Sequence, residues 1–262
     1  MPLLAHVHAS TVLLLIVAGV CALQGVIFFF PQLWWRRDTG GQAEKGLVLW
    51  VEPLRFLGIR WGERSAAAGL RRAGFRGEFR YWEWHGALGG TLLAPVLRNR
   101  RLIETAARRL ADFIVQYRTA HPERPLVVIG YSAGGFLVAR ALELLPEGVT
   151  VDAAGVFSST FSPWHDLRPA AEHVRGRLVV TSSLYDFVIL GLGVLLTGGA
   201  DGRHTPAIGM LGYLGPAHDR ILQRRWRPRL LRHGLAGMHD WSLLPNYFVR
   251  FAADLGLGER GK

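Results

Sequence analysis

The chain has 262 residues, enough for one large domain with a sizeable core or for two small domains. Half of the residues are hydrophobic and 19% are charged, which excludes an intrinsically disordered chain and argues against a polyanion-binding coat. Cys21 is the single cysteine, so an internal disulfide framework and a cysteine-rich zinc module are excluded. The net charge is +11, and all of it belongs to residues 36–262, because residues 1–35 contain no Asp, Glu, Lys or Arg.

The first apolar segment, residues 11–30, has the length and composition of a membrane-spanning helix. As a helix it would extend about 30 Å, the thickness of the hydrocarbon core of a bilayer. Pro31 ends it, and two tryptophans and two arginines follow at residues 34–37, where they suit the interface and the lipid headgroups. A cleaved secretory signal is the alternative, but residues 1–10 lack the positive side chains that it needs. We therefore expect an uncleaved anchor over residues 1–37, with bilayer lipid as a partner.

The orientation of this anchor follows from the arginines behind it. Positive side chains next to a membrane-spanning helix favour the cytoplasmic side, so we expect residues 36–262 in the cytoplasm. A single cysteine is compatible with either side of the membrane.

After a polar linker at residues 38–44, short apolar runs alternate with helical patterns. Strands are expected over residues 45–53, 77–84, 124–132, 150–159 and 176–183, with a weaker one over 227–234. Helices are expected over residues 63–74, 98–120, 136–146 and 240–256. This alternation predicts an α/β fold with a mostly parallel sheet and helices on both faces, in one domain over residues 45–256 before a tail at 257–262. Ligands of such sheets bind beyond the carboxyl ends of the strands.

The strongest motif is Gly-Tyr-Ser-Ala-Gly-Gly at residues 130–135, between an apolar strand and a helical run. A serine on so tight a strand-to-helix turn has a strained backbone, so small residues must flank it. The turn lifts the Ser132 hydroxyl above the sheet and directs the Ala133 amide toward a bound substrate. We interpret Ser132 as a nucleophile and Ala133 as an oxyanion donor.

With this motif in this context, the chain resembles the α/β-hydrolase fold family of serine esterases and lipases, over roughly residues 45–254. The resemblance implies an acid after a later strand and a histidine in the loop before the last helix. Asp186 follows the run 176–183, and His239 lies in a glycine-containing loop before the closing helix. The order Ser132, Asp186, His239 is the family order, which implies a catalytic triad.

Other residues compete for two of these roles. Asp240 adjoins the histidine but suits a helix cap, and Asp201 in a glycine-rich loop is a stronger alternative acid. His218 is the alternative base, but no closing helix follows it soon.

The resemblance also implies a second oxyanion donor in the loop after the first core strand. By alignment that donor is the amide of Leu54, although Glu-Pro-Leu-Arg at residues 52–55 replaces the His-Gly common in relatives. A His-Gly pair occurs later, at residues 85–86, and could line the pocket or supply the donor instead. Candidate pocket residues are Tyr131, Trp84 and His85.

An insertion is expected over residues 187–225, beginning with an apolar run at 187–199 that is too short to span a bilayer. That run is either a lid or acyl pocket, or a buried helix packed on the sheet. An arginine cluster at residues 224–229 follows. Arginines also recur on the expected helices, where we expect solvated faces and, for an anchored domain, attraction to anionic lipid: Arg71, Arg72, Arg98, Arg100, Arg101, Arg108 and Arg109. No motif indicates a metal, a cofactor or a nucleic-acid-binding module.

Together these features predict a membrane-anchored serine hydrolase that cleaves an ester-like, apolar acyl substrate through an acyl-enzyme. One alternative is a catalytically inactive member that binds a ligand or partner at the membrane, which the unusual loop at residues 52–55 favours. Another is an acyltransferase that uses the same three residues.

Overall fold

The computed structural model describes residues 40–53, 60, 62–85 and 99–258, together with three isolated positions, Thr11, Gly19 and Val26. The predicted membrane-spanning segment, apart from those three positions, lies outside the described residues, and so does Leu54. Among the residues that are described, no helix is long and apolar enough to cross a membrane.

The described chain is built on a six-stranded sheet in the order β2-β1-β3-β4-β5-β6, in which every neighbouring pair of strands is parallel. The strands are β1 (Leu47–Val51), β2 (Glu78–Tyr81), β3 (Leu126–Tyr131), β4 (Ala153–Phe157), β5 (Leu178–Ser182) and β6 (Ile221–Arg225). Strands β1, β3, β4 and β5 are buried along their whole length, which explains their continuous apolar sequences. The predicted parallel α/β fold is confirmed.

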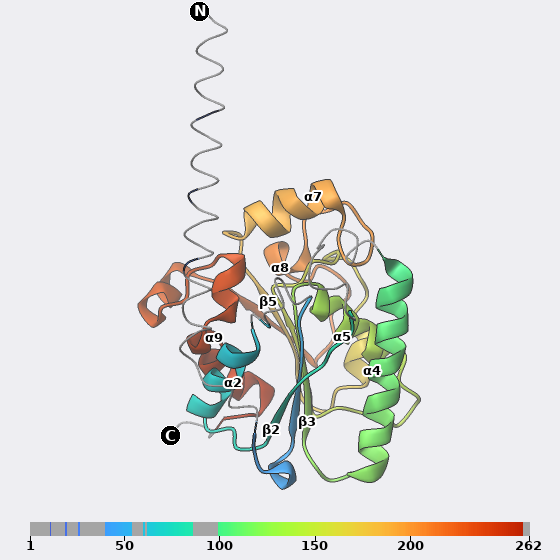
Figure 1. The fold of residues 1–262 in the computed structure, drawn as a ribbon. Coiled ribbons are helices and arrows are strands. Elements are labelled where there is room, and N and C mark those ends of the chain that lie inside the picture. The colour runs from blue at the N-terminus through green and yellow to red at the C-terminus, as the bar shows by residue number, and fades with distance from the viewer. Residues whose placement is uncertain are drawn as a thin grey trace, which may run out of the picture. The chain divides into compact units, whose positions relative to one another are not determined.

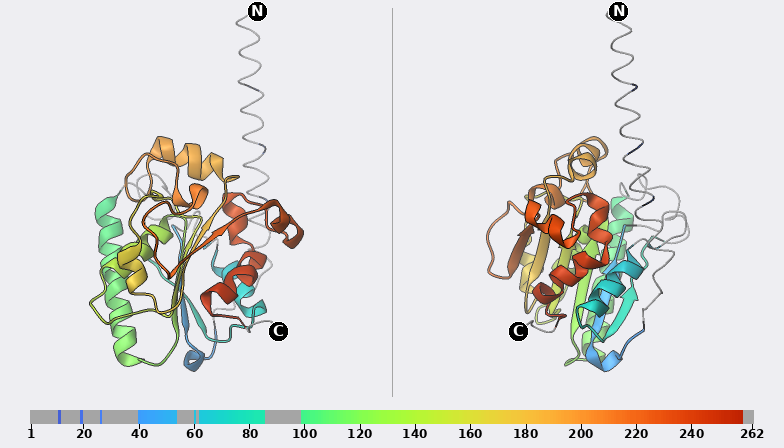
Figure 2. Two further views of the ribbon diagram at one scale, coloured as in Figure 1. Left: turned by 180° about the vertical axis from the view of Figure 1, so that it is seen from behind. Right: turned by 90° about the vertical axis from the view of Figure 1, so that its left-hand side faces the viewer.

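Helices cover both faces of this sheet (Figures 1 and 2). Helices α2 (Glu63–Arg72) and α9 (Pro245–Ala252) pack together on one face. The other face carries α4 (Arg100–Ala120), α5 (Ala133–Glu143) and the short α6 (Arg168–Glu172). A 3₁₀ turn, η1 (Ala43–Lys45), leads into β1.

Each face has its own core. Helix α4 buries Ile103, Leu110 and Ile114, spaced at helical intervals, in an aliphatic cluster with α5 and the sheet. The opposite face is aromatic, with the rings of Trp50 and Phe248 centred 5.3 Å apart. The helices on both faces bury apolar surface against the same sheet, and this close packing holds the strand ends rigidly in place.

The carboxyl-terminal third differs from the prediction in two places. The strand expected over residues 227–234 is wrong: the segment holds a 3₁₀ helix, η4 (Pro228–His233), and the last strand is β6, inside the predicted insertion. Strand β6 is an edge strand with the half-exposed sequence Ile-Leu-Gln-Arg-Arg, so it lacks a buried strand's apolar signature. The closing helix is divided into η5 (His239–Leu243), α9 and η6 (Ala253–Leu255), with Pro245 as the first residue of α9.

The apolar run after β5 is a π-helix, η3 (Phe187–Gly193), continued by α7 (Val194–Thr197), with α8 (Ile208–Leu211) beneath it (Figure 1). Its large buried side chains are Leu190 and Val194, which pack near Ala207. Of the two alternatives for this run, the buried helix packed on the sheet is wrong, because most of its large side chains are exposed. We call the following exposed side chains the apolar crest: Leu184, Tyr185, Phe187, Val188, Leu192, Leu195 and Leu196.

The turn between β3 and α5 is packed so closely that two of its glycines are required. A Cβ atom on Gly130 would lie 2.3 Å from the carbonyl oxygen of Gly134, and one on Gly134 would lie 2.2 Å from that of Val51. Both positions are backbone-on-backbone contacts, which cannot yield as a flexible side chain could. The helix α5 therefore begins directly against β1.

We expect Gly134→Ala to lower the free energy of unfolding by about 1–3 kcal/mol, because the new methyl group overpacks the contact with Val51. Gly40→Ala is the control, since a Cβ there meets no atom within 4 Å. Urea denaturation measures both. Equal unfolding midpoints for the two variants would contradict the close packing of this turn.

Candidate active site

Ser132 lies at the carboxyl edge of the sheet, between β3 and α5, with φ 54° and ψ −125°. A positive φ is unfavourable for a residue with a side chain and persists only where neighbours enforce it. Here the Ser132 amide donates to the carbonyl of Phe157 at 3.0 Å, and the Ser159 hydroxyl donates to the Ser132 carbonyl at 2.5 Å. Strand β4 and the residues after it thus hold the strained serine in place.

The structure brings Ser132, Asp186 and His239 together, although Ser132 and His239 are 107 residues apart in sequence. His239 Nε2 lies 3.1 Å from Ser132 Oγ, and His239 Nδ1 lies 2.8 Å from Asp186 Oδ2. All three residues are buried, with exposed fractions of 6%, 4% and 6% for Ser132, Asp186 and His239. Low exposure strengthens the electrostatic coupling within this chain of hydrogen bonds.

The chemistry of these three side chains determines the direction of the hydrogen bonds. An ionised Asp186 only accepts, so Nδ1 of His239 carries the proton and donates it. The other nitrogen, Nε2, is then an acceptor for the Ser132 hydroxyl. This arrangement can withdraw a proton from Ser132 and stabilise the resulting imidazolium.

Contacts with β3 and β4 hold the loop that carries His239. The Tyr131 hydroxyl donates to the His239 carbonyl at 3.2 Å, and the two rings are centred 5.0 Å apart. Ser242, three residues later, has its hydroxyl 2.6 Å from that of Ser158. Tyr131, predicted to line the pocket, is 4% exposed and supports the histidine.

Tyr247 extends this polar network beneath the loop. Burial raises the pKa of the Tyr247 hydroxyl, which hydrogen-bonds with Thr181, Ser158 and Ser242. Ser158 also has a positive φ of 43°, a second strained serine at a strand end. Sequence reasoning missed Ser158, Ser242 and Tyr247. Ser158 could have been noticed as a hydroxyl directly after a buried strand, whereas Tyr247 has the spacing of an ordinary core residue.

The competing residues have other partners. Asp201 is buried and accepts hydrogen bonds from the amides of Ser162 and Arg203, so it organises its own loop. His218 accepts from the amide of Arg220 at 3.2 Å. The side chain of Asp240 lies outside the described part of the chain.

Of the two predicted oxyanion donors, the structure describes Ala133 but not Leu54. Ala133 is the first residue of α5, so its amide has no acceptor within the helix. Leu54 lies outside the described residues, but Glu52, two residues before it, is described. Trp84 Nε1 donates to the carbonyl of Glu52 at 2.8 Å, and His85 Nε2 lies 3.3 Å from the same oxygen. Trp84 and His85, predicted to line the pocket, are both buried next to the carboxyl end of β1.

Glu52 is an unusual acid at this end of β1. Its Oε2 accepts from Trp50 Nε1 at 3.0 Å and from the Gly62 amide at 2.7 Å, while its buried Oε1 has no hydrogen-bond partner among the described residues. Burial raises the pKa of Glu52 from 4.5 to about 8, against the hydrogen bonds from Trp50 and Gly62, which lower it. The carboxyl is therefore mainly neutral at pH 7, and it adds little negative charge beside the loop expected to hold an oxyanion.

Within residues 40–53, 60, 62–85 and 99–258, no three His, Cys, Asp or Glu side chains are grouped as ligands for a metal ion.

Because the pKa of Glu52 is raised on folding, the folded state binds more protons than the unfolded state between about pH 4.5 and pH 8. We expect this residue to make the free energy of unfolding fall as pH rises through that window, by up to about 1.4 kcal/mol per pH unit. Glu52→Gln should remove that slope, whereas Glu123→Gln, at an exposed position, should retain it. Urea denaturation at several pH values measures the difference, and equal slopes in wild type and Glu52→Gln would contradict a neutral Glu52.

The chain resembles solved hydrolase structures at low sequence identity. No protein-family model matches the chain, and no curated protein matches it. A dienelactone hydrolase from Anabaena variabilis is 16% identical with a TM-score of 0.47, over 82% of this chain and 87% of that one. The catalytic core domain of acetyl xylan esterase from Trichoderma reesei is 16% identical with a TM-score of 0.46, and the match covers 83% of this chain and 100% of that domain.

A third solved structure, Pyrococcus horikoshii acylaminoacyl peptidase, is 14% identical with a TM-score of 0.44 over 85% of this chain. The chain spans 39% of that peptidase's length. Since these TM-scores lie below 0.5, the assignment of the fold rests on the chain's own architecture. The parallel sheet, the strand–turn–helix at Ser132 and the order of Ser132, Asp186 and His239 are those of the α/β-hydrolase fold, and the resemblance inferred from the sequence is confirmed at that level.

Proposed function

We propose that this protein is a membrane-anchored serine hydrolase that cleaves an ester-like, apolar acyl substrate. The observation that carries the proposal is the continuous hydrogen-bonded chain from Ser132 through His239 to Asp186. Distances of 3.1 Å and 2.8 Å are within the range needed for proton transfer and for orientation of the imidazole. An inactive binding protein has no need for this geometry, and for this reason we favour an enzyme.

The proposed reaction begins with attack of Ser132 Oγ on the substrate carbonyl while His239 Nε2 takes the hydroxyl proton. Asp186 holds the imidazolium that forms. The amide of Ala133, with the adjacent positive end of α5, and the amide of Leu54 stabilise the oxyanion. His239 returns the proton to the leaving alcohol, and water then cleaves the acyl-enzyme by the same steps in reverse order.

The proposed membrane location rests on the sequence of residues 11–30, which contains no charged side chain. The arginines at residues 36–37 favour a cytoplasmic position for the domain. In this arrangement the domain is tethered next to lipid, where apolar esters concentrate.

The proposed apolar substrate is supported by the apolar crest. Its residues flank Asp186 directly in sequence, with Tyr185 before it and Phe187 after it. Leu196 is 68% exposed and Leu192 is 57% exposed, so these side chains are largely uncovered within the described fold. Exposed apolar side chains gathered next to a candidate active site are typical of a binding site for an apolar ligand or a lipid surface.

The nucleophile is tested with a fluorophosphonate probe, which reacts with activated serines. We expect wild type to be labelled and Ser132→Ala to remain unlabelled. Asp186→Asn should reduce the rate of ester hydrolysis about 10³- to 10⁴-fold, since the histidine loses its orientation and charge partner. Asp201→Asn is the matched control and should retain most of the rate. Equal labelling of wild type and Ser132→Ala would contradict the assignment of the nucleophile.

The acyl group is tested with p-nitrophenyl esters of increasing chain length. We expect kcat/KM to rise by up to about fourfold per methylene group where the chain contacts apolar surface. Leu192→Asn with Leu196→Asn should lower the preference for long chains, while Leu231→Asn, an equally exposed leucine on η4, should leave it unchanged. If the acetyl ester is the best substrate, the proposal of an apolar acyl substrate is wrong, but the assignment of Ser132 as the nucleophile is unaffected. Analysis of the products in the presence of an added alcohol distinguishes hydrolysis from acyl transfer.

A further inference from the structure

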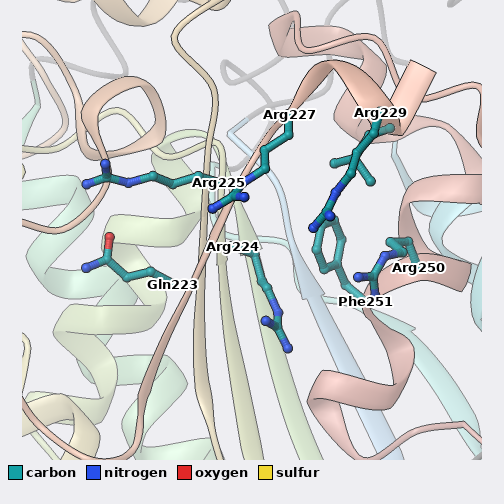
Figure 3. A pocket seen from close by; sticks show the side chains of 8 residues that line it. Gln223, Arg224, Arg225, Arg227, Arg229, Arg250 and Phe251 are labelled. Carbon is teal, nitrogen blue, oxygen red and sulfur yellow. The ribbon is translucent and has the colours of Figure 1, made fainter. Parts of the chain in front are cut away.

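A concentration of positive charge surrounds a cavity at the edge of the sheet, next to α9. The cavity has a volume of about 350 Å³ and lies between β6, η4 and α9 (Figure 3). Its lining consists of Gln223, Arg224, Arg225, Arg227, Arg229, Leu230, Arg250 and Phe251. We call it the arginine pocket. Five arginines and no acid line it, so its electrostatic potential is strongly positive.

Carboxylates in the described part of the chain leave most of this charge uncompensated. Arg224 is held by Asp254 through hydrogen bonds of 2.8 and 2.5 Å. The other four arginines of the pocket form no ion pair with any carboxylate in the part of the chain that the structure describes. Like charges gathered around one cavity repel one another, and a bound anion would remove that cost.

The arginines reach the pocket from elements held in place by other contacts. Arg225 belongs to β6, which pairs with β5 along its whole length, and its guanidinium points away from those of Arg224, Arg229 and Arg250 (Figure 3). Arg250 is on α9, and its guanidinium lies 5.8 Å from the ring centre of Phe251, which is buried. Arg229 follows Pro228, the first residue of η4, which restricts the backbone there. The backbone that carries these arginines is therefore in place before a ligand arrives, whereas their side chains are exposed and would become ordered around the ligand.

The number and geometry of the donors indicate the class of ligand. A guanidinium binds oxyanions through two parallel N–H donors, and a single carboxylate is saturated by one or two such groups. A terminal phosphate carries close to two negative charges and three acceptor oxygens, so it can engage several arginines at once. We propose that the arginine pocket binds a phosphate group, either of a soluble phosphorylated compound or of a phospholipid headgroup.

The test is isothermal titration of the full-length protein with pyrophosphate at low ionic strength. We expect saturable binding at one site, weakened at least tenfold by the double variant Arg227→Gln, Arg229→Gln. The control is Arg101→Gln, Arg109→Gln, which removes the same charge from exposed positions on α4 and should change the dissociation constant less than twofold. Thermal melting establishes that both double variants are folded, as expected for exposed side chains.

The two sources of the phosphate are separated by titrating glycerol 3-phosphate and dihexanoyl phosphatidic acid, which carry the same phosphate monoester. Tighter binding of the second supports a lipid headgroup, and equal or weaker binding supports a soluble compound. Three results overturn the proposal: no binding of pyrophosphate, equal binding by the Arg227→Gln, Arg229→Gln variant, or succinate binding as tight as pyrophosphate. Because the assay measures binding without turnover, its failure would leave the proposed hydrolase activity standing.

Discussion

The strained backbone of Ser132 is the constraint on which the candidate active site depends. Its positive φ exists because β3 passes into α5 without an intervening loop, and this is possible only because the helix approaches β1 closely at Gly134. The same approach brings the start of α5, and so the Ala133 amide, to the carboxyl end of the sheet. Strain, close packing and the orientation of the hydroxyl are therefore one structural feature. The surrounding strands stabilise it through the hydrogen bonds of Phe157 and Ser159 to the Ser132 backbone.

A second group of contacts determines where the histidine lies. His239 begins the short 3₁₀ helix η5, and hydrogen bonds with Tyr131 and Ser158 hold this segment at the ends of β3 and β4. Tyr131 thus serves two purposes, since it precedes the strained serine in the chain and supports the carbonyl of the histidine. Buried polar networks of this kind are costly when incomplete, because an unpaired group would remain desolvated. Completeness of the network therefore favours a single position of the imidazole.

Charge and apolarity are distributed unevenly on this fold. The apolar crest follows β5 and the arginine pocket lies along β6. Tyr185 of the crest has its ring centred 4.7 Å from that of Trp226, which lies between Arg225 and Arg227 in the chain. At the candidate active site, the side chains of Asp186 and Glu52 are almost inaccessible to solvent, and Glu52 is mainly uncharged at neutral pH. The excess positive charge of the chain therefore includes a structured cavity as well as solvated helix faces.

By itself, the sequence determined the parallel sheet, the turn at Ser132 and the order of the three candidate catalytic residues. The sheet and the turn depend on short apolar runs and on glycines next to a serine, which are local patterns, and the order of the three residues follows from the resemblance to the α/β-hydrolase fold family. Only the tertiary structure decided that β6 is a strand, that the run after Asp186 faces outward and that Tyr131 supports His239. An edge strand carries no buried apolar pattern, and an apolar helix has the same composition whether it is covered or exposed. The partners of His239, like the uncharged state of Glu52, arise from contacts between residues far apart in the chain, which no local pattern contains.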